Sequence, residues 1–198
     1  MQSNEPPPLI LASASPRRAE LLTVLVPAFE IVPADIDERQ HTGEHATDYV
    51  RRMAESKART VFTRCAETHP SRVVLGSDTV VVLGQECLGK PVDADQAVDM
   101  LQRLSDRAHQ VLSAVSTIEP SGRIETRVNA TEVDFAPLPQ HWIDAYVASG
   151  EPMDKAGAYA IQSEASAWIP AIRGSYSGVM GLPLHETAEL LRAARLIR

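Results

Sequence analysis

The sequence predicts an α/β fold, because short apolar strands and amphipathic helices alternate along its 198 residues. Residues 9–25 read as an apolar strand, a turn of small residues and a helix. Residues 73–83 form a near-continuous β-branched run, which is typical of a strand buried on both faces. Residues 109–118 and 123–136 predict a hairpin. The length suits one domain, or one domain with two lobes, around a sizeable core.

Composition and charge narrow the function classes. The net charge of −7 argues against general nucleic-acid binding, so an anionic substrate would need local positive charge. Cys65 and Cys87 lack metal-type spacing and suggest reduced thiols in the cytoplasm. Residues 1–8 lack the features of a signal peptide and are expected to form a flexible tail before a single domain over residues 9–198. No apolar stretch approaches membrane-spanning length, so no membrane partner is expected.

The turn after the first strand resembles an anion site. Ser13 and Ser15 belong to a loop of small residues, Ser15 can cap the helix, and Pro16 suits the first helical position. Arg17 and Arg18 stand in the first turn, where the helix dipole disfavours a cation unless an anion binds there. The alternative is an ordinary strand-to-helix junction with solvated arginines.

Residues 29–32 predict a second strand, which an acidic loop follows. Asp35, Asp37 and Glu38 lie close together in that loop. Such a loop is usually solvated, although it could supply a metal ligand.

The next helix is expected to begin at a Thr47 cap and to run to about Glu67. Lys57 falls on its apolar stripe. A lysine there either extends its ammonium to solvent at the edge of the stripe or points into a cleft toward an anionic ligand.

Asp78 lies in the middle of the strand over residues 73–83. The preceding Gly76 and Ser77 suggest a bulge. A carboxylate in such a strand must be paired, bind a cation or take up a proton. It is therefore either a structural hydrogen-bonding residue or a functional acid, and we favour the functional interpretation.

The chain then predicts a turn and a short return strand over residues 86–88. Lys90, between a glycine and a proline, is a second candidate anion ligand or an ordinary loop lysine. Asp93 is expected to cap a helix, with Gln96 in the capping-box position.

The remaining elements follow from apolar periodicity and turn residues. A change of apolar parity between Ala130 and Val133 suggests a bulge in the second strand of the hairpin. Residues 140–148 predict a helix, and Pro183 starts a last one. Residues 154–162 read as a charged pair, small residues and a strand.

Sequence motifs along nearly the whole chain point to a known family. In order, they are LASASPRRAELL, GSDTVV, GKP, LSDRAHQV, DKAGAYAIQ and GVMGLPL. This set resembles the Maf family of nucleoside triphosphate pyrophosphatases. The resemblance implies a three-layer, inosine-triphosphatase-like fold, with a mixed twisted sheet flanked by helices and a cleft between two lobes. It also implies hydrolysis of a nucleotide to the monophosphate and pyrophosphate with a divalent cation, Mg²⁺ or Mn²⁺.

The resemblance assigns roles to residues at matching positions. Asp78 matches the family's general base and, with Glu38, the expected metal ligands. Ser13, in the first motif, is expected to bind substrate. The basic residues at phosphate-binding positions are Arg18, Lys57, Lys90 and, in the DKAG motif, Lys155.

Three further positions match the branch of the family that acts on dTTP and UTP. They are Arg17, Thr79 and Gln162. A glutamine amide can both donate to and accept from the pairing edge of uracil or thymine, whereas the glutamate typical of the 7-methyl-GTP branch can only accept. The departures from the family pattern include Ser113, where threonine is common, and residues 178–180 near the expected base pocket.

The expected function is therefore hydrolysis of dTTP and UTP, and of modified pyrimidine nucleotides, as a house-cleaning activity. The alternatives are a nucleotide-binding regulator of cell division without turnover and a nucleotidyl transferase. Family analogy also suggests a homodimer.

Overall fold

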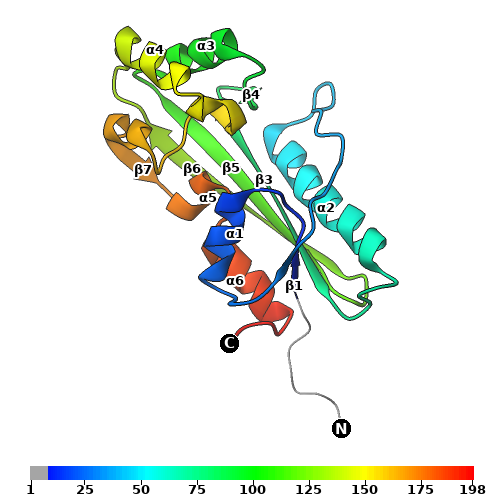
Figure 1. Ribbon diagram of the computed structural model, residues 1–198. Helices are drawn as coiled ribbons and strands as arrows, with labels where there is room; N and C mark the ends of the chain where they lie inside the picture. Colours follow the sequence, from blue (N-terminus) through cyan, green and yellow to red (C-terminus); the bar gives the residue numbers. More distant parts are fainter. Residues whose placement is uncertain (1–8) are drawn as a thin grey trace.

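The computed structural model describes residues 9–198, which fold around a seven-stranded mixed sheet (Figure 1). The predicted tail over residues 1–8 lies outside the described residues. The strands are β1 (Leu9–Leu11), β2 (Glu30–Ile31), β3 (Val73–Leu83), β4 (Glu86–Leu88), β5 (Ala108–Ile118), β6 (Ile124–Asp134) and β7 (Ala171–Arg173). Their order is β2-β1-β3-β5-β6-β7, with β4 also paired to β3. Strands β1, β2 and β3 are parallel, and the other pairs are antiparallel.

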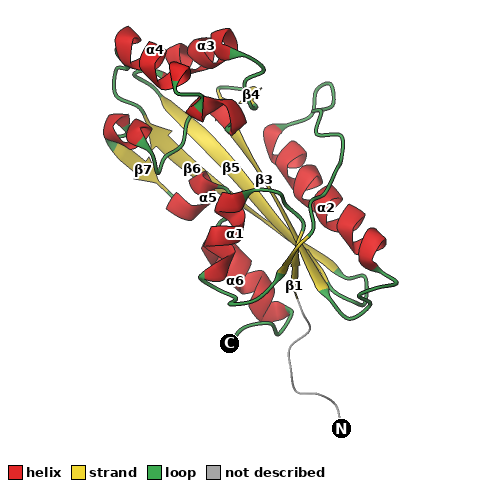
Figure 2. Ribbon diagram, in the orientation of Figure 1, coloured by secondary structure: helices red, strands yellow, loops and turns green. Residues whose placement is uncertain are grey.

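Helices cover both faces of this sheet (Figure 2). The α-helices are α1 (Pro16–Thr23), α2 (Ala46–Cys65), α3 (Ala94–Leu104), α4 (Gln140–Ala148), α5 (Tyr176–Met180) and α6 (Leu184–Ala193). Three 3₁₀ helices are η1 (Glu151–Asp154), η2 (Ala156–Ala158) and η3 (Glu164–Trp168). The predicted α/β class and three-layer arrangement are confirmed.

The alternation of side chains along β3 explains the layers. Val74 points to one face and belongs to a cluster with Val61 of α2. Leu75 points to the other face and belongs to a cluster with Leu22 of α1 and Leu191 of α6. Both faces of β3 are therefore apolar, as the β-branched run predicted.

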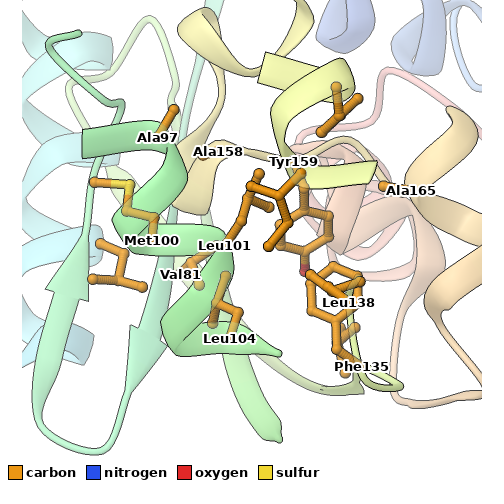
Figure 3. Close-up of a cluster of buried hydrophobic side chains, with 14 of the residues drawn as sticks. Val81, Ala97, Met100, Leu101, Leu104, Phe135, Leu138, Ala158, Tyr159 and Ala165 are labelled. Carbon is orange, nitrogen blue, oxygen red and sulfur yellow. The ribbon is translucent and has the colours of Figure 1, made fainter. Parts of the chain in front are cut away.

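A second core lies at the other end of the long strands (Figure 3). Val81 of β3, Leu101 of α3 and Tyr159 meet there. This core and the one around α1 and α6 form two lobes, which share β3, β5 and β6.

The predicted bulge at Gly76-Ser77 is wrong, because β3 and β5 pair in continuous register from Val74 to Val82. Gly76 serves packing instead. A Cβ atom added there would lie 2.3 Å from the Ala54 carbonyl oxygen, so the glycine lets α2 approach the sheet closely.

The predicted bulge in β6 is also wrong, because its register with β5 is continuous. Val128 packs on the α2 face, whereas Val133 belongs to the core of the other lobe on the opposite face. The apolar parity changes because different layers cover the two parts of the strand: α2 packs on one face near Val128, and the core around α3 and α4 packs on the opposite face near Val133.

Two further local predictions need correction. Thr47 lies within the first turn of α2, whose N-cap is His45 without a side-chain cap bond. The loop before the helix is held instead by the Arg52–Glu44 ion pair at 2.6 Å. The strand expected within residues 154–162 is absent from the described part of the chain; two 3₁₀ helices end there, and the Ala160 amide donates to the Tyr146 hydroxyl.

Within residues 9–198, no helix has both the length and the apolar character needed to cross a bilayer.

We predict that Gly76→Ala destabilises the protein, because the new methyl group would overlap the backbone of α2. Overpacking of this kind costs about 1–3 kcal/mol in the free energy of unfolding, which urea denaturation would measure. Gly89→Ala is the matched control, since within residues 9–198 no atom other than those of its chain neighbours lies within 4 Å of the Cβ position at Gly89. Equal stability of the two variants would contradict this account of the packing.

Candidate active site

The site begins at a gap in one edge of the sheet. Strand β1 pairs with β3 only from Val73 to Leu75, and β4 pairs with it only from Val81 to Leu83. Among the described strands, none therefore pairs with residues 76–80 on that edge, although β5 pairs along the other edge. We call this interval the notch. It places Asp78 and Thr79 next to the turn that follows β1.

A cleft of about 520 Å³ opens at the notch. Both lobes line it, and it contains all of the residues to which the sequence analysis gave a site role. They are Ser13, Arg17, Arg18, Glu38, Lys57, Asp78, Thr79, Lys90, Lys155 and Gln162.

Lys57 lies between two carboxylates of the cleft, one buried and one exposed. The Lys57 Nζ atom lies 2.7 Å from Asp78 Oδ1 and 2.6 Å from Glu38 Oε1. Lys57 and Asp78 are only 6% and 7% exposed. Burial raises the pKa of Glu38, but the hydrogen bond and charge of Lys57, with Lys90 and Arg18 farther away, hold that pKa below its ordinary value.

The second oxygen of Asp78 remains available. Oδ2 has no hydrogen-bond partner among the described residues, and it is not fully buried. It therefore reaches the solvent of the cleft, where it can accept a hydrogen bond from water or contact a cation.

Arg18 is held at the first turn of α1. Ser15 caps this helix as predicted, with its hydroxyl accepting from the Arg18 amide. The guanidinium Nε donates to the Gly181 carbonyl oxygen at 2.8 Å, and Nη1 donates to Ser13 Oγ at 3.3 Å. Burial lowers the pKa of Arg18, while Asp78 and Glu38 act in the opposite direction. These bonds fix the orientation of a cation in the cleft.

Contacts between the lobes cross the cleft near Asp154. Its carboxylate lies 2.5 Å from Lys155 Nζ and 3.4 Å from Arg17 Nη1. Lys90 follows β4, and the adjacent Gly89 carbonyl accepts from the Gly157 amide at 3.0 Å. The two loops that carry Lys90 and Lys155 are thereby tied together.

The other part of the cleft is largely apolar. Its walls come from Val81, Val111, Tyr159, Val179 and Met180. The polar residues Thr79 and Gln162 also line it, and Gln162 is exposed. Apolar walls with a few polar groups suit a flat heterocycle.

Sequence reasoning missed Tyr49 and Tyr159, which both line the cleft. Burial first, and then the charges of Asp78 and Glu38, raise the pKa of Tyr49 to about 12. Tyr49 precedes Lys57 by about two turns of α2, so helical periodicity could have placed it near the site. Tyr159 belongs to the DKAGAYAIQ motif, but this segment is irregular, so no sequence periodicity indicates where its side chain points.

The carboxylates of the cleft suit a hard divalent cation that the substrate helps to hold. Among residues 9–198 there is no cluster of three or more side chains of the kind that binds a metal alone. Asp78 and Glu38 nevertheless converge on one cationic group. Mg²⁺ is commonly bound by one or two carboxylates together with substrate phosphates and water, so these residues fit such an ion.

A structural comparison shows the fold family. The chain resembles a HAM1 protein from Coxiella burnetii, with a TM-score of 0.52 and 16% identity over 94% of this chain and 99% of that chain. This likeness confirms the predicted fold and, at such identity, concerns the fold alone.

Sequence comparisons identify the family as well as the fold. The Maf-like protein family matches residues 8–194. A dTTP/UTP pyrophosphatase of Anaeromyxobacter dehalogenans is 52% identical over 191 residues, which span 95% of this chain and 94% of that protein. One from Aromatoleum aromaticum is 47% identical over 195 residues, spanning 93% of this chain and 94% of that protein. This chain therefore belongs to the Maf-like protein family.

Proposed function

We propose that this protein hydrolyses dTTP and UTP to the nucleoside monophosphate and pyrophosphate. One observation supports this above all: a buried acid in the notch shares a cleft with several cations that distant segments contribute. The relatives named dTTP/UTP pyrophosphatases, at about half identity over nearly the whole chain, support the same reaction.

The charges in the cleft match a triphosphate. The cleft of a chain whose net charge is −7 is lined by more cations than carboxylates. The cations are Arg17, Arg18, Lys57, Lys90 and Lys155, and the carboxylates are Glu38, Asp78 and Asp154. A nucleoside triphosphate carries several negative charges at neutral pH, and such charges bind at clustered cations. The apolar half of the cleft leaves room for the base.

The reaction would need little covalent chemistry from the protein. A water molecule hydrogen-bonded to the free Oδ2 of Asp78 would attack the α-phosphorus in line, while the bond to the leaving pyrophosphate breaks. Asp78 would orient this water or take its proton. Arg18, Lys90 and Lys155 would offset the charge on the attacked and leaving groups.

A divalent metal ion is part of the proposal. Asp78 and Glu38 would hold it, and when bound it supplies charge neutralisation and polarisation of phosphate oxygens. Lys57, which now bridges both carboxylates, would then be free to face a phosphate. The homodimer and the cytoplasmic location stay predictions.

Two other functions would use the same cleft. A regulator of cell division would bind nucleotide without turnover, and a nucleotidyl transferase would pass the nucleotide to an acceptor. Pyrophosphate release from dTTP and UTP, with Mg²⁺ and no added acceptor, separates the three. We expect release at a steady rate over many turnovers; no release beyond background would reject the hydrolase.

Asp78→Asn should lower the turnover of UTP by at least about 10²-fold, because an amide cannot accept the proton of the attacking water. The measurement is kcat from pyrophosphate release, with thermal unfolding to verify the fold. Asp37→Asn, at an exposed carboxylate paired with Arg39 outside the cleft, is the control. A normal rate in the Asp78 variant would end this mechanism.

Lys57→Met should destabilise the protein in a pH-dependent manner. It leaves Asp78 and Glu38 without their shared counter-ion, and removing one partner of a buried pair costs about 3 kcal/mol in the free energy of unfolding. Because Lys57 lowers the pKa of Glu38, its stabilisation is fully present above pH 4.5, the ordinary Glu value, and is lost as the pH falls through the folded-state pKa.

Denaturation of wild type and Lys57→Met at pH 7 and pH 4 tests this expectation. The deficit should shrink at pH 4. Lys90→Met is the control: Lys90 has no ion-pair partner among residues 9–198 and lowers the pKa of Glu38 less than Lys57 does, so its deficit should be smaller and should change less with pH. An equal deficit at both pH values would mean that lost packing, and not lost charge, is the cause.

Gln162→Glu should shift base preference away from uracil, because a carboxylate cannot donate to the uracil carbonyl oxygens. We expect the ratio of kcat/KM for UTP to that for GTP to fall by at least about tenfold, the equivalent of one lost hydrogen bond. Gln102→Glu, the same change at an exposed glutamine of α3, is the control. An unchanged ratio across a nucleotide panel would refute the assignment of Gln162.

A further inference from the structure

A chain of hydrogen bonds lies behind the apolar half of the cleft. Thr79 of β3 and Ser113 of β5 are directly opposite in the antiparallel register, and their hydroxyl oxygens are 2.8 Å apart. The Ser113 hydroxyl also lies 2.6 Å from the Gly178 carbonyl oxygen. Ser113 is 1% exposed, and no site role was expected for it.

The direction of these bonds follows from counting hydrogens. A serine hydroxyl has one hydrogen, and a carbonyl oxygen can only accept. At 2.6 Å, two oxygens without a hydrogen between them would repel each other, so Ser113 donates to Gly178. The hydrogen in the 2.8 Å contact must then come from Thr79, which donates to Ser113.

The Thr79 hydroxyl can only accept a further hydrogen bond, because its hydrogen is used. A free threonine hydroxyl can either donate or accept, so it would not discriminate between base edges. The hydrogen of Thr79 is already committed to Ser113, which is not among the residues that line the cleft. Thr79 Oγ1 therefore presents only lone pairs to the cleft that it lines.

We propose that Ser113 is a positioning residue for base selection, because it makes Thr79 an obligatory acceptor for a base N–H. Uracil and thymine carry a hydrogen at N3, which Thr79 can accept. Cytosine carries a lone pair at N3, which the lone pairs of Thr79 would repel. This inference rests on the proposed function for the identity of the ligand and adds the exclusion of cytosine to it.

The test measures equilibrium binding of UMP and CMP by calorimetry. Neither nucleotide contains an anhydride bond, so the readout does not depend on turnover. Wild type should prefer UMP. Ser113→Ala frees the Thr79 hydrogen for the ligand, so the ratio of the CMP to the UMP dissociation constant should fall by at least about tenfold, mainly through tighter CMP binding.

Three variants separate positioning from simple structural damage. Ser113→Thr keeps a hydroxyl and should keep the wild-type ratio. Ser116→Ala removes a buried serine of the same strand that bonds with Thr126 away from the cleft, and should also keep it. Thr79→Val removes the acceptor, and adding Ser113→Ala to that variant should not change its ratio further.

The outcomes are distinct. The inference would be overturned if Ser113→Ala kept the wild-type preference for UMP over CMP, or if it weakened the binding of both by the same factor. It would also be overturned if the wild-type protein bound neither mononucleotide. If the ratio responds as expected but wild type releases no pyrophosphate from UTP, the inference stands and the proposed reaction fails. If UTP is hydrolysed and the ratio does not respond, the reaction stands and the inference fails.

Discussion

The Lys57 ammonium between Asp78 and Glu38 is the interaction on which the site depends. A carboxylate within a β-branched strand and a lysine on the apolar stripe of a helix would each be costly alone, because burial disfavours the charged form. Their 2.7 Å contact requires α2 to lie close against β3. Gly76 permits that approach, since any side chain there would meet the backbone of α2. Packing and electrostatics at this point therefore depend on each other.

The short length of β1 leaves the Lys57–Asp78 pair open to the cleft. Because β1 ends beside Leu75 and β4 pairs with β3 only from Val81 to Leu83, the described strands leave the edge of β3 open where Asp78 stands. The chain that leaves β1 enters α1 at once, which brings Arg18 to the same opening. An acidic protein thus concentrates positive charge in one place through the topology of its sheet.

Sequence reasoning located this site through residues in unexpected environments. Asp78 in an apolar strand and Lys57 on an apolar stripe were both conspicuous, and the cleft contains both. Prediction from the sequence failed where the structure depends on which layer of helices covers a strand. The parity change in β6 suggested a bulge, but Val128 and Val133 pack against different layers on opposite faces of the sheet. The irregular segment around Tyr159 was also misread, because a side chain, Tyr146, bonds its backbone in place of a strand.

The polarity of Thr79 illustrates a property that no sequence pattern could indicate. Its role as acceptor depends on Ser113, which is distant in sequence, and on the carbonyl group of Gly178 beyond it. The residue common in the family at position 113 is threonine, which has the same single hydroxyl hydrogen. Replacement of threonine by serine therefore changes a methyl group and leaves the direction of the bonds unaltered. Base selection then depends on the direction of the hydroxyl hydrogens, which Ser113 of β5 fixes.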